Sequence, residues 1–262
     1  MSVERKFEVV CEIEPPTRPD LMHVRHQIGV LSSVASTFLI PDNHIGRATV
    51  SSVAVAHEVE QMGGRSIACL NARDRNLLGL RRDLLTAAAY GVDQFLFVYG
   101  DRPSSGGRTA HLTVQAMIDE LRAFPAMHSH VPARPFRVGV AAGSGPLPAW
   151  KREADYLFAQ VQFSLDQLLR WRSEITFDGP VYAGVMVVPS VTMALKISAD
   201  IPQLAVPDAW LDVIEKDPSA GVRIACDLVM EIKASGAFDG VHLIPVSRYR
   251  AVAADLEGRL LP

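Results

Sequence analysis

The segment Arg65–Pro103 brings together polar residues of the kinds that bind ligands and transfer protons. A small apolar run is followed by the polar sequence NARDRN at Asn71–Asn76 and by an amphipathic helical pattern over Leu77–Ala89. A second apolar run, Gln94–Tyr99, ends in a glycine and Asp101. Two strands joined by one helix are parallel and end at the same edge of a sheet. Ligands bind at that edge, so the polar loop and the aspartate are candidates for one site.

Two carboxylates and two glutamines on other expected strands are further candidates for chemistry. Glu12 and Glu14 lie on one face of an alternating strand near the N-terminus. A glutamate inside a strand is rare unless it is functional or lies at a barrel mouth, where it can act as a general acid. Gln160 and Gln162 share one face of a later strand.

Each candidate also has a purely structural interpretation. Glu12 could be a solvated carboxylate at the rim, and Asp101 could be a turn residue before Arg102. A salt-bridged loop would account for Asn71, Arg73 and Asp74. The same holds for the polar residues after the second strand, which are Asp42, Asn43 and His44.

Apolar runs alternate with helical patterns along the whole chain. The expected strands are 7–14, 36–40, 66–70, 94–99, 136–142, 156–164, 181–188 and 241–246. The expected helices are 21–31, 50–62, 77–89, 112–124, 165–171, 191–199, 209–214 and 220–235, with one more after the last strand. One strand, one helix and their loops need about 30 residues. The sequence therefore predicts an α/β fold, a single-domain (β/α)8 TIM barrel over residues 1–262.

An open, doubly wound sheet is the main alternative fold. It usually has fewer strands, and a glycine-rich turn follows its first strand. This chain has Pro15-Pro16 at that position, which favours the closed barrel.

Composition and charge bear on the class of protein. The chain has 48% hydrophobic and 21% charged residues, as ordinary globular domains do. Its net charge of −3, with no long basic run, speaks against nucleic-acid binding. The longest apolar run is too short to span a bilayer and the N-terminus lacks a signal-peptide core, so we expect no membrane association and a cytoplasmic location. The scattered cysteines Cys11, Cys69 and Cys226 predict neither a metal site nor a disulfide framework.

Six motifs, in order along the chain, resemble those of methylenetetrahydrofolate reductases. ARDRN at 72–76 and GVDQFLFVYGDRP at 91–103 are similar to the family's CRDRN-like loop and GD-x-P loop, at the family's separation. EIEPP at 12–16 resembles the first-strand motif. The remaining three are AQVQFSLD at 159–166, AGVMVVPS at 183–190 and GVHLIPVSR at 240–248. The chain thus resembles a short, single-barrel form of this family.

The resemblance implies roles for the candidate residues. The family's general acid corresponds to Glu12, with Glu14 as the second candidate. Its aspartate beside the pterin corresponds to Asp101, which would bind the substrate and stabilise a cationic iminium. Its pterin-binding glutamine corresponds to Gln160 or Gln162, and both assignments stay open. The residues expected to contact the cofactor are Asn71, Arg73, Asp74 and Tyr99.

The implied reaction reduces 5,10-methylenetetrahydrofolate to 5-methyltetrahydrofolate. The one-carbon unit bridges N5 and N10, and hydride cannot add until the five-membered ring opens to an N5 iminium. Protonation of N10 by a carboxylic acid with a raised pKa would drive that opening.

The chain departs from the family where the family binds FMN. Cys69 stands in place of a histidine and Gly143 in place of an aromatic residue, and the segment that follows is shorter than usual. The glycine-rich GSG sequence at 143–145 could still receive a phosphate. We therefore expect direct hydride transfer from NADH or NADPH without FMN.

Two alternatives remain at this stage. One is an FMN-dependent reductase or a related folate methyl-transfer enzyme on the same barrel. The other is a non-catalytic folate-binding or partner subunit, although such a subunit would have no reason to keep Glu12, Asp101 and the glutamines together. The sequence leaves the oligomeric state open.

Overall fold

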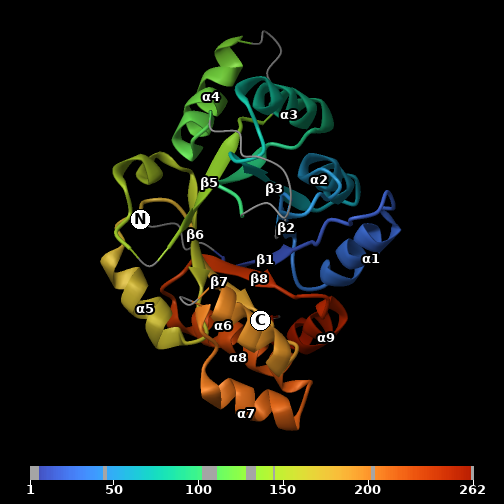
Figure 1. Ribbon diagram of the computed structural model, residues 1–262, viewed down its shortest axis with the longest axis vertical. Helices are drawn as coiled ribbons and strands as arrows, with labels where there is room; N and C mark the ends of the chain where they lie inside the picture. The colour runs from blue at the N-terminus through green and yellow to red at the C-terminus, as the bar shows by residue number, and fades with distance from the viewer. Residues whose placement is uncertain are drawn as a thin grey trace.

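Eight parallel strands form a closed barrel in the computed structural model (Figure 1). The structure describes residues 6–43, 46–101, 111–127, 134–143, 145–201 and 204–260. Each strand pairs with the next along the chain, and the last pairs with the first. The strands are β1 (Glu8–Glu12), β2 (Thr37–Ile40), β3 (Arg65–Asn71), β4 (Gln94–Val98), β5 (Arg137–Ala142), β6 (Tyr156–Val161), β7 (Val181–Met186) and β8 (Gly240–Ile244). The predicted (β/α)8 barrel is confirmed.

Helices surround the barrel, and three of them in succession separate β7 from β8 (Figure 1). They are α1 (Met22–Leu31), α2 (Ser52–Gln61), α3 (Leu77–Tyr90), α4 (Val114–Met127), α5 (Leu165–Glu174), α6 (Val191–Asp200), α7 (Asp208–Lys216), α8 (Ala220–Ser235) and α9 (Tyr249–Leu260), with the short 3-10 helix η2 (Ala149–Glu153) before β6. None of the helices in the described ranges is both long enough and apolar enough to cross a bilayer.

Helix α4 runs further than its sequence suggests. We expected the helix to end at Phe124, because Pro125 lacks a backbone N–H. In the structure Pro125 lies inside the last turn of α4. Only a few residues follow the proline there, so the lost hydrogen bond does not end the helix before it.

Side chains along β1 alternate between two apolar clusters. Val9 and Cys11 belong to the large core that joins the barrel to its helices, whereas Val10 belongs to the cluster inside the barrel. Because successive side chains of a strand point to opposite faces, Glu8 and Glu12 share the inner face with Val10. The first strand therefore directs a carboxylate into the barrel at each of its ends.

Three aromatic rings fill the barrel interior beside glycines of neighbouring strands. The rings of Phe158 and Tyr182 stack with their centroids 5.0 Å apart, and Tyr156 meets Phe158 edge-on at 5.7 Å. A Cβ added at Gly139 would lie 2.1 Å from the Tyr156 ring, and one added at Gly240 would lie 2.1 Å from a backbone oxygen of β1. The large rings thus fit into the limited interior of the barrel because residues without a side chain lie next to them.

A register shift interrupts β6 near its C-terminal end. Phe158 pairs with Tyr182, but the next pair joins Val161 to Gly184, so β6 has one more residue than β7 between the two pairs. A Cβ at Gly184 would lie 2.7 Å from a backbone oxygen of β6. The missing side chain leaves room for this bulge, which breaks the regular alternation of side chains.

Gly139→Ala is expected to destabilise the fold by about 1–3 kcal/mol, because the new methyl group would overlap the buried Tyr156 ring. Gly143→Ala is the matched control, since a Cβ there, just beyond β5, meets no atom within 4 Å. It should change the stability by less than about 0.5 kcal/mol. Urea denaturation midpoints at unchanged m-value measure both effects. Equal midpoints for the two variants would contradict this account of the interior.

Candidate active site

The sequence candidates lie at one end of the barrel. Because all eight strands are parallel, their C-terminal ends share one rim. Glu12 is the last residue of β1 and Asn71 the last of β3. Asp101 follows the end of β4, and Gln160 is the next-to-last residue of β6. This arrangement agrees with a common site, although their roles in it stay predictions.

Glu12 forms a close pair with His242 of the adjacent strand β8. The His242 Nε2 atom lies 3.4 Å from Glu12 Oε2, and the two side chains are only 11% and 13% exposed. His242 Nε2 is buried and makes no hydrogen bond to a residue in the described ranges. A carboxyl group and an imidazole at this distance, largely shielded from water, can share or exchange a proton.

The thiol of Cys69 lies within electrostatic range of Glu12. Its side chain is buried in the apolar cluster inside the barrel. Burial, followed by the negative charges of Glu12 and Asp42, raises the pKa of the Cys69 thiol well above its ordinary value. The thiol therefore stays protonated and acts as an uncharged, apolar neighbour of Glu12.

The polar loop after β3 is anchored to a buried carboxylate at the end of β2. Asp42 accepts hydrogen bonds from the backbone N–H of Asn71 at 3.0 Å and from its side-chain amide at 2.6 Å. Arg75 also donates to Asp42, and its Nε contacts Asp83 of α3 at 2.8 Å. The loop is thus fixed to two neighbouring elements by charged hydrogen bonds.

Arg73 and Asp74 form a second ion pair in the same loop. Arg73 is 2% exposed, and its Nε donates to Asp74 at 2.6 Å. This hydrogen bond, with further ones from Asn43 and Asn71, lowers the pKa of Asp74 from 3.8 to about 2. The hydrogen bond to Asp74 is the largest cause that raises the pKa of the Arg73 guanidinium, and the negative charge of Asp101 raises it further. Arg73 thereby links the loop electrostatically to the exposed Asp101.

These contacts engage the side chains that we expected to bind the cofactor. Asn71, Arg73 and Asp74 bond to one another or to Asp42 and Asn43, as in the salt-bridged loop that was the structural alternative. Direct ligand contacts by these three side chains stay a prediction. His44 and Arg102 lie outside the described residues.

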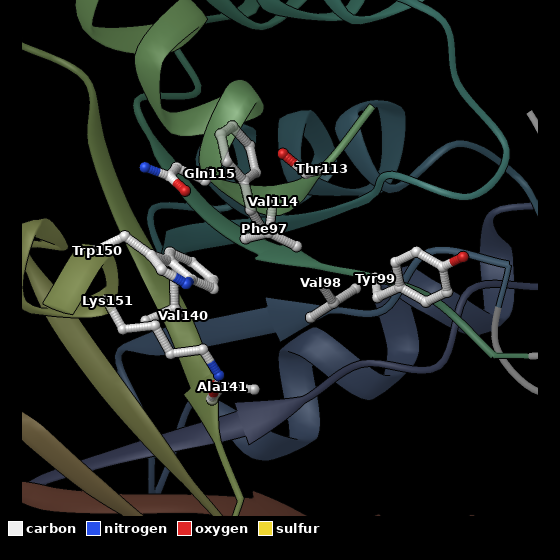
Figure 2. A pocket seen from close by; sticks show the side chains of 10 residues that line it. All are labelled: Phe97, Val98, Tyr99, Thr113, Val114, Gln115, Val140, Ala141, Trp150 and Lys151. Carbon is white, nitrogen blue, oxygen red and sulfur yellow. Dashed lines mark hydrogen bonds between the residues drawn. The ribbon is translucent and has the colours of Figure 1, made fainter. Parts of the chain in front are cut away.

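Tyr99, the fourth of these residues, borders a hollow between β4, β5 and the start of α4 (Figure 2). The hollow has a volume of about 490 Å³, and the Tyr99 side chain is 53% exposed. Figure 2 shows Trp150 and Lys151 on the side opposite Tyr99. The Lys151 ammonium donates to the Ala141 carbonyl at 2.6 Å, and burial lowers the pKa of this ammonium. Of the described residues that line this hollow, Lys151 alone is cationic.

The two glutamines of β6 have different surroundings. Gln160 is exposed and lies in the bulge, where its side-chain oxygen accepts from the next backbone N–H at 3.1 Å. Gln162 follows the strand and lines a shallow hollow with residues of the outer helix α5. The expectation of a shared face assumed unbroken alternation, which the bulge removes. The choice between the two as pterin ligand stays open.

His242 is not among the residues expected from the sequence to take part in the chemistry, although it stands in the closing-strand motif GVHLIPVSR. A histidine in the middle of an otherwise apolar strand is the signal that could have identified it.

The turn after the same strand is also unusual, because Val246 and Ser247 adopt positive φ angles of 45° and 61°. Two successive non-glycine residues in the left-handed region indicate strain that surrounding contacts must hold in place.

One family model matches part of the chain. The sequence profile of the methylenetetrahydrofolate reductase family matches residues 150–257, from η2 into α9. The resemblance to this family is confirmed over that segment. No curated protein matches the sequence significantly.

Solved structures with the same barrel cover nearly the whole chain. An uncharacterised Clostridium thermocellum protein that binds two copies of 5-methyl-5,6,7,8-tetrahydrofolic acid has a TM-score of 0.64 and 12% identity, over 97% of this chain and 96% of that chain. Tryptophan synthase from M. tuberculosis has a TM-score of 0.55 and 15% identity, over 98% and 94%. A long-chain alkane monooxygenase has a TM-score of 0.55 and 11% identity, over 98% and 92%. At these identities the similarity shows the fold alone.

Asp74→Asn should destabilise the protein at neutral pH and lose that effect in acid. A carboxylate whose pKa falls from 3.8 to about 2 on folding stabilises the folded state above pH 3.8. The contribution is of the order of 2 kcal/mol, and it is lost as the pH falls from about 4 to about 2. Urea unfolding of the variant and the parent at pH 7, 5, 4 and 3 measures the difference.

The control for this prediction is Asp212→Asn, because Asp212 is an exposed residue of α7. Its replacement should leave the stability unchanged within about 0.5 kcal/mol at every pH. A stability difference for Asp74→Asn that does not depend on pH would show that the ion pair is not its cause.

Proposed function

We propose that this protein is a methylenetetrahydrofolate reductase that converts 5,10-methylenetetrahydrofolate to 5-methyltetrahydrofolate with NADH or NADPH. The observation that carries the proposal is the largely buried Glu12 carboxyl group on the inner face at the barrel mouth, in a chain whose residues 150–257 match that family. The similar Clostridium thermocellum protein, which binds 5-methyltetrahydrofolic acid, supports a folate as the ligand of this barrel too.

Glu12 supplies the proton that opens the substrate ring. The N10 atom of the folate takes this proton, and the bond between N10 and the one-carbon unit then breaks with its electron pair on N10. The lone pair of N5 forms a cationic iminium with the released carbon. Hydride from the reduced nicotinamide adds to that carbon and gives the N5-methyl product and the oxidised nicotinamide. A general acid placed for this step contributes about 10²–10⁴ in rate.

Asp101 and a glutamine of β6 orient and stabilise the substrate. The Asp101 carboxylate is exposed at the same rim, where it favours the positive charge that develops on N5. Arg73, which is paired with Asp74, lies close enough to interact electrostatically with this carboxylate. Gln160 is exposed at the end of β6, and an amide there can donate to and accept from a pterin ring.

The residues present do not fit a bound FMN. Cys69, where the family has a histidine, is buried inside the barrel and offers no polar contact at the rim. The carbonyl of Gly143 already accepts a hydrogen bond from the Trp171 indole at 2.9 Å. Lys151, a cation that lines the nearby hollow, donates to a backbone carbonyl. We therefore propose that hydride passes directly from the nicotinamide to the folate.

Glu12→Gln is the decisive variant for the proposed chemistry. Glutamine keeps the shape of the side chain but has no proton to donate, so turnover should fall by about 10²–10⁴. The affinity for 5-methyltetrahydrofolate should change little, because the lost interaction belongs to the ring-opening step. Oxidation of NADH in the presence of methylenetetrahydrofolate measures turnover, and calorimetry measures binding.

The matched control is Glu14→Gln, two residues along the strand. The Glu14 side chain is exposed and borders a separate hollow beside the two prolines, so its replacement should cost much less activity. An inactive Glu14→Gln beside an active Glu12→Gln would assign the acid to the other carboxylate. Folate binding without any turnover in the parent protein would favour a folate-binding role over catalysis.

The flavin content of the purified protein tests the direct hydride transfer. Protein prepared without added cofactor should lack the visible absorption band of a flavin and still oxidise NADH with methylenetetrahydrofolate. Added FMN should not increase the rate. Stoichiometric FMN, or activity that requires it, would refute direct transfer and leave the reductase assignment in place.

A further inference from the structure

We propose that His242 is the positioning residue of the acid Glu12, and that the imidazole and the carboxyl group hold one proton between them. The inference deepens the proposed function, since it assigns a partner to the residue that protonates the folate. The pair itself is a feature of the structure and does not depend on which substrate binds.

The pair arises from the closure of the barrel. Strand β8 lies beside β1, with His242 opposite Val10. Glu12 is two residues further along β1 on the same inner face, so the two side chains meet diagonally across the strand pair. The resulting distance of 3.4 Å between Nε2 and Oε2 needs only a small rotation of either side chain to become a hydrogen bond.

The surroundings leave His242 Nε2 with Glu12 as its acidic partner. The atom is buried without a hydrogen bond in the described part of the chain, and the ring of Phe158 covers the imidazole edge-on at 5.4 Å. An unpaired polar atom in such a place costs free energy, and sharing a proton with a carboxyl group removes that cost.

The other ionisable groups near the pair are uncharged or engaged elsewhere. On β3, Cys69 carries a protonated thiol. At the far end of the barrel, Glu8 of β1 accepts from the Tyr182 hydroxyl of β7 at 2.6 Å. Beyond the end of β2, Asp42 is bound by Asn71 and by an arginine. The contact with His242 is therefore the ion pair available to Glu12 among the described residues.

Sharing one proton solves a problem that a lone carboxylic acid would have. A glutamate in water ionises near pH ~4.3 and a histidine near pH ~6.5, so at neutral pH an isolated glutamate has no proton to give. When two groups are coupled, the pH at which they lose their common proton is a property of the pair and not of either residue alone. The proton lies either on Oε2, with neutral imidazole, or on Nε2, with carboxylate.

The relay conserves protons and electrons in each turnover. The N–H bond of the imidazolium breaks as the carboxylate takes the proton, and the carboxyl group then gives it to N10 of the folate. Neutral imidazole and carboxylate remain, and water supplies the proton that restores the pair. The imidazole itself does not touch the reacting atoms, which makes it a positioning residue.

Nuclear magnetic resonance of the protein alone tests the pair without any substrate. The imidazole Cε1–H signal of His242, assigned by its loss in His242→Asn, is followed against pH in the parent, Glu12→Gln and Glu14→Gln proteins. The pH dependence of the His242 signal should differ between Glu12→Gln and the parent, because the neighbouring carboxylate is gone. Glu14→Gln should leave the signal unchanged.

Two results would overturn the inference. One is an identical titration of His242 in the parent and in Glu12→Gln, and the other is an equal shift in Glu14→Gln. If His242→Asn fails to fold, the nuclear Overhauser contact of the imidazole with the Phe158 ring assigns the signal instead.

Kinetics separate the relay from a merely structural role. His242→Asn and His242→Gln should lower kcat at least about tenfold with KM for the folate nearly unchanged, and kcat should begin to fall at a lower pH than in the parent. A raised KM with unchanged kcat would show that His242 only shapes the pocket. If the titrations are coupled but the parent has no reductase activity, the proposed function fails while the proton pair stands. If the parent is active and the titrations are uncoupled, the inference alone fails.

Discussion

The limited volume inside the closed barrel is the constraint on which the rest of the structure depends. Eight strands leave room for side chains only if large residues on some strands face small ones on others. The large side chains are the aromatic rings of β6 and β7, Tyr156, Phe158 and Tyr182. The small residues beside them are Gly139 on β5 and Gly240 on β8, where a Cβ would clash. The Phe158 ring also packs edge-on against the His242 imidazole at 5.4 Å, and the side chains of His242 and Glu12 are only 11% and 13% exposed.

Charged residues at the C-terminal rim divide into two groups with different surroundings. The charged residues of the loop after β3 form ion pairs within the protein. Arg73 pairs with Asp74 of the same loop, and Arg75 pairs with Asp42 beyond the end of β2. Such pairs hold a loop in one conformation but leave few donors for a ligand. Glu12 and Asp101, in contrast, are placed inside the mouth and at its edge. Among the described residues, this division favours a site built from few residues on a rigid frame.

Much of the fold could be predicted from the sequence, because the patterns that indicate strands and helices lie within short segments of the chain. Alternation over Phe7–Glu14 placed Val10 and Glu12 on one face of the strand and Val9 and Cys11 on the other, and the structure confirms that division. Which of the two faces points into the barrel came from the tertiary structure. Strand and helix positions likewise follow from runs and periods within short windows. The salt-bridged loop was one of two interpretations of NARDRN, since the sequence showed the charges but not their partners on β2 and α3.

The features that decide the site required the tertiary structure. His242 and Glu12 become neighbours only because β8 closes on β1, and no local pattern gives the register of that closure. The bulge in β6, which separates the surroundings of Gln160 from those of Gln162, depends on the absence of a side chain at Gly184 on the next strand. The sequence by itself determined which strands form and which residues of the first strand share a face, because both depend on neighbouring residues. Pairing across the closed barrel depends on residues far apart in the chain, and only the folded structure decided it.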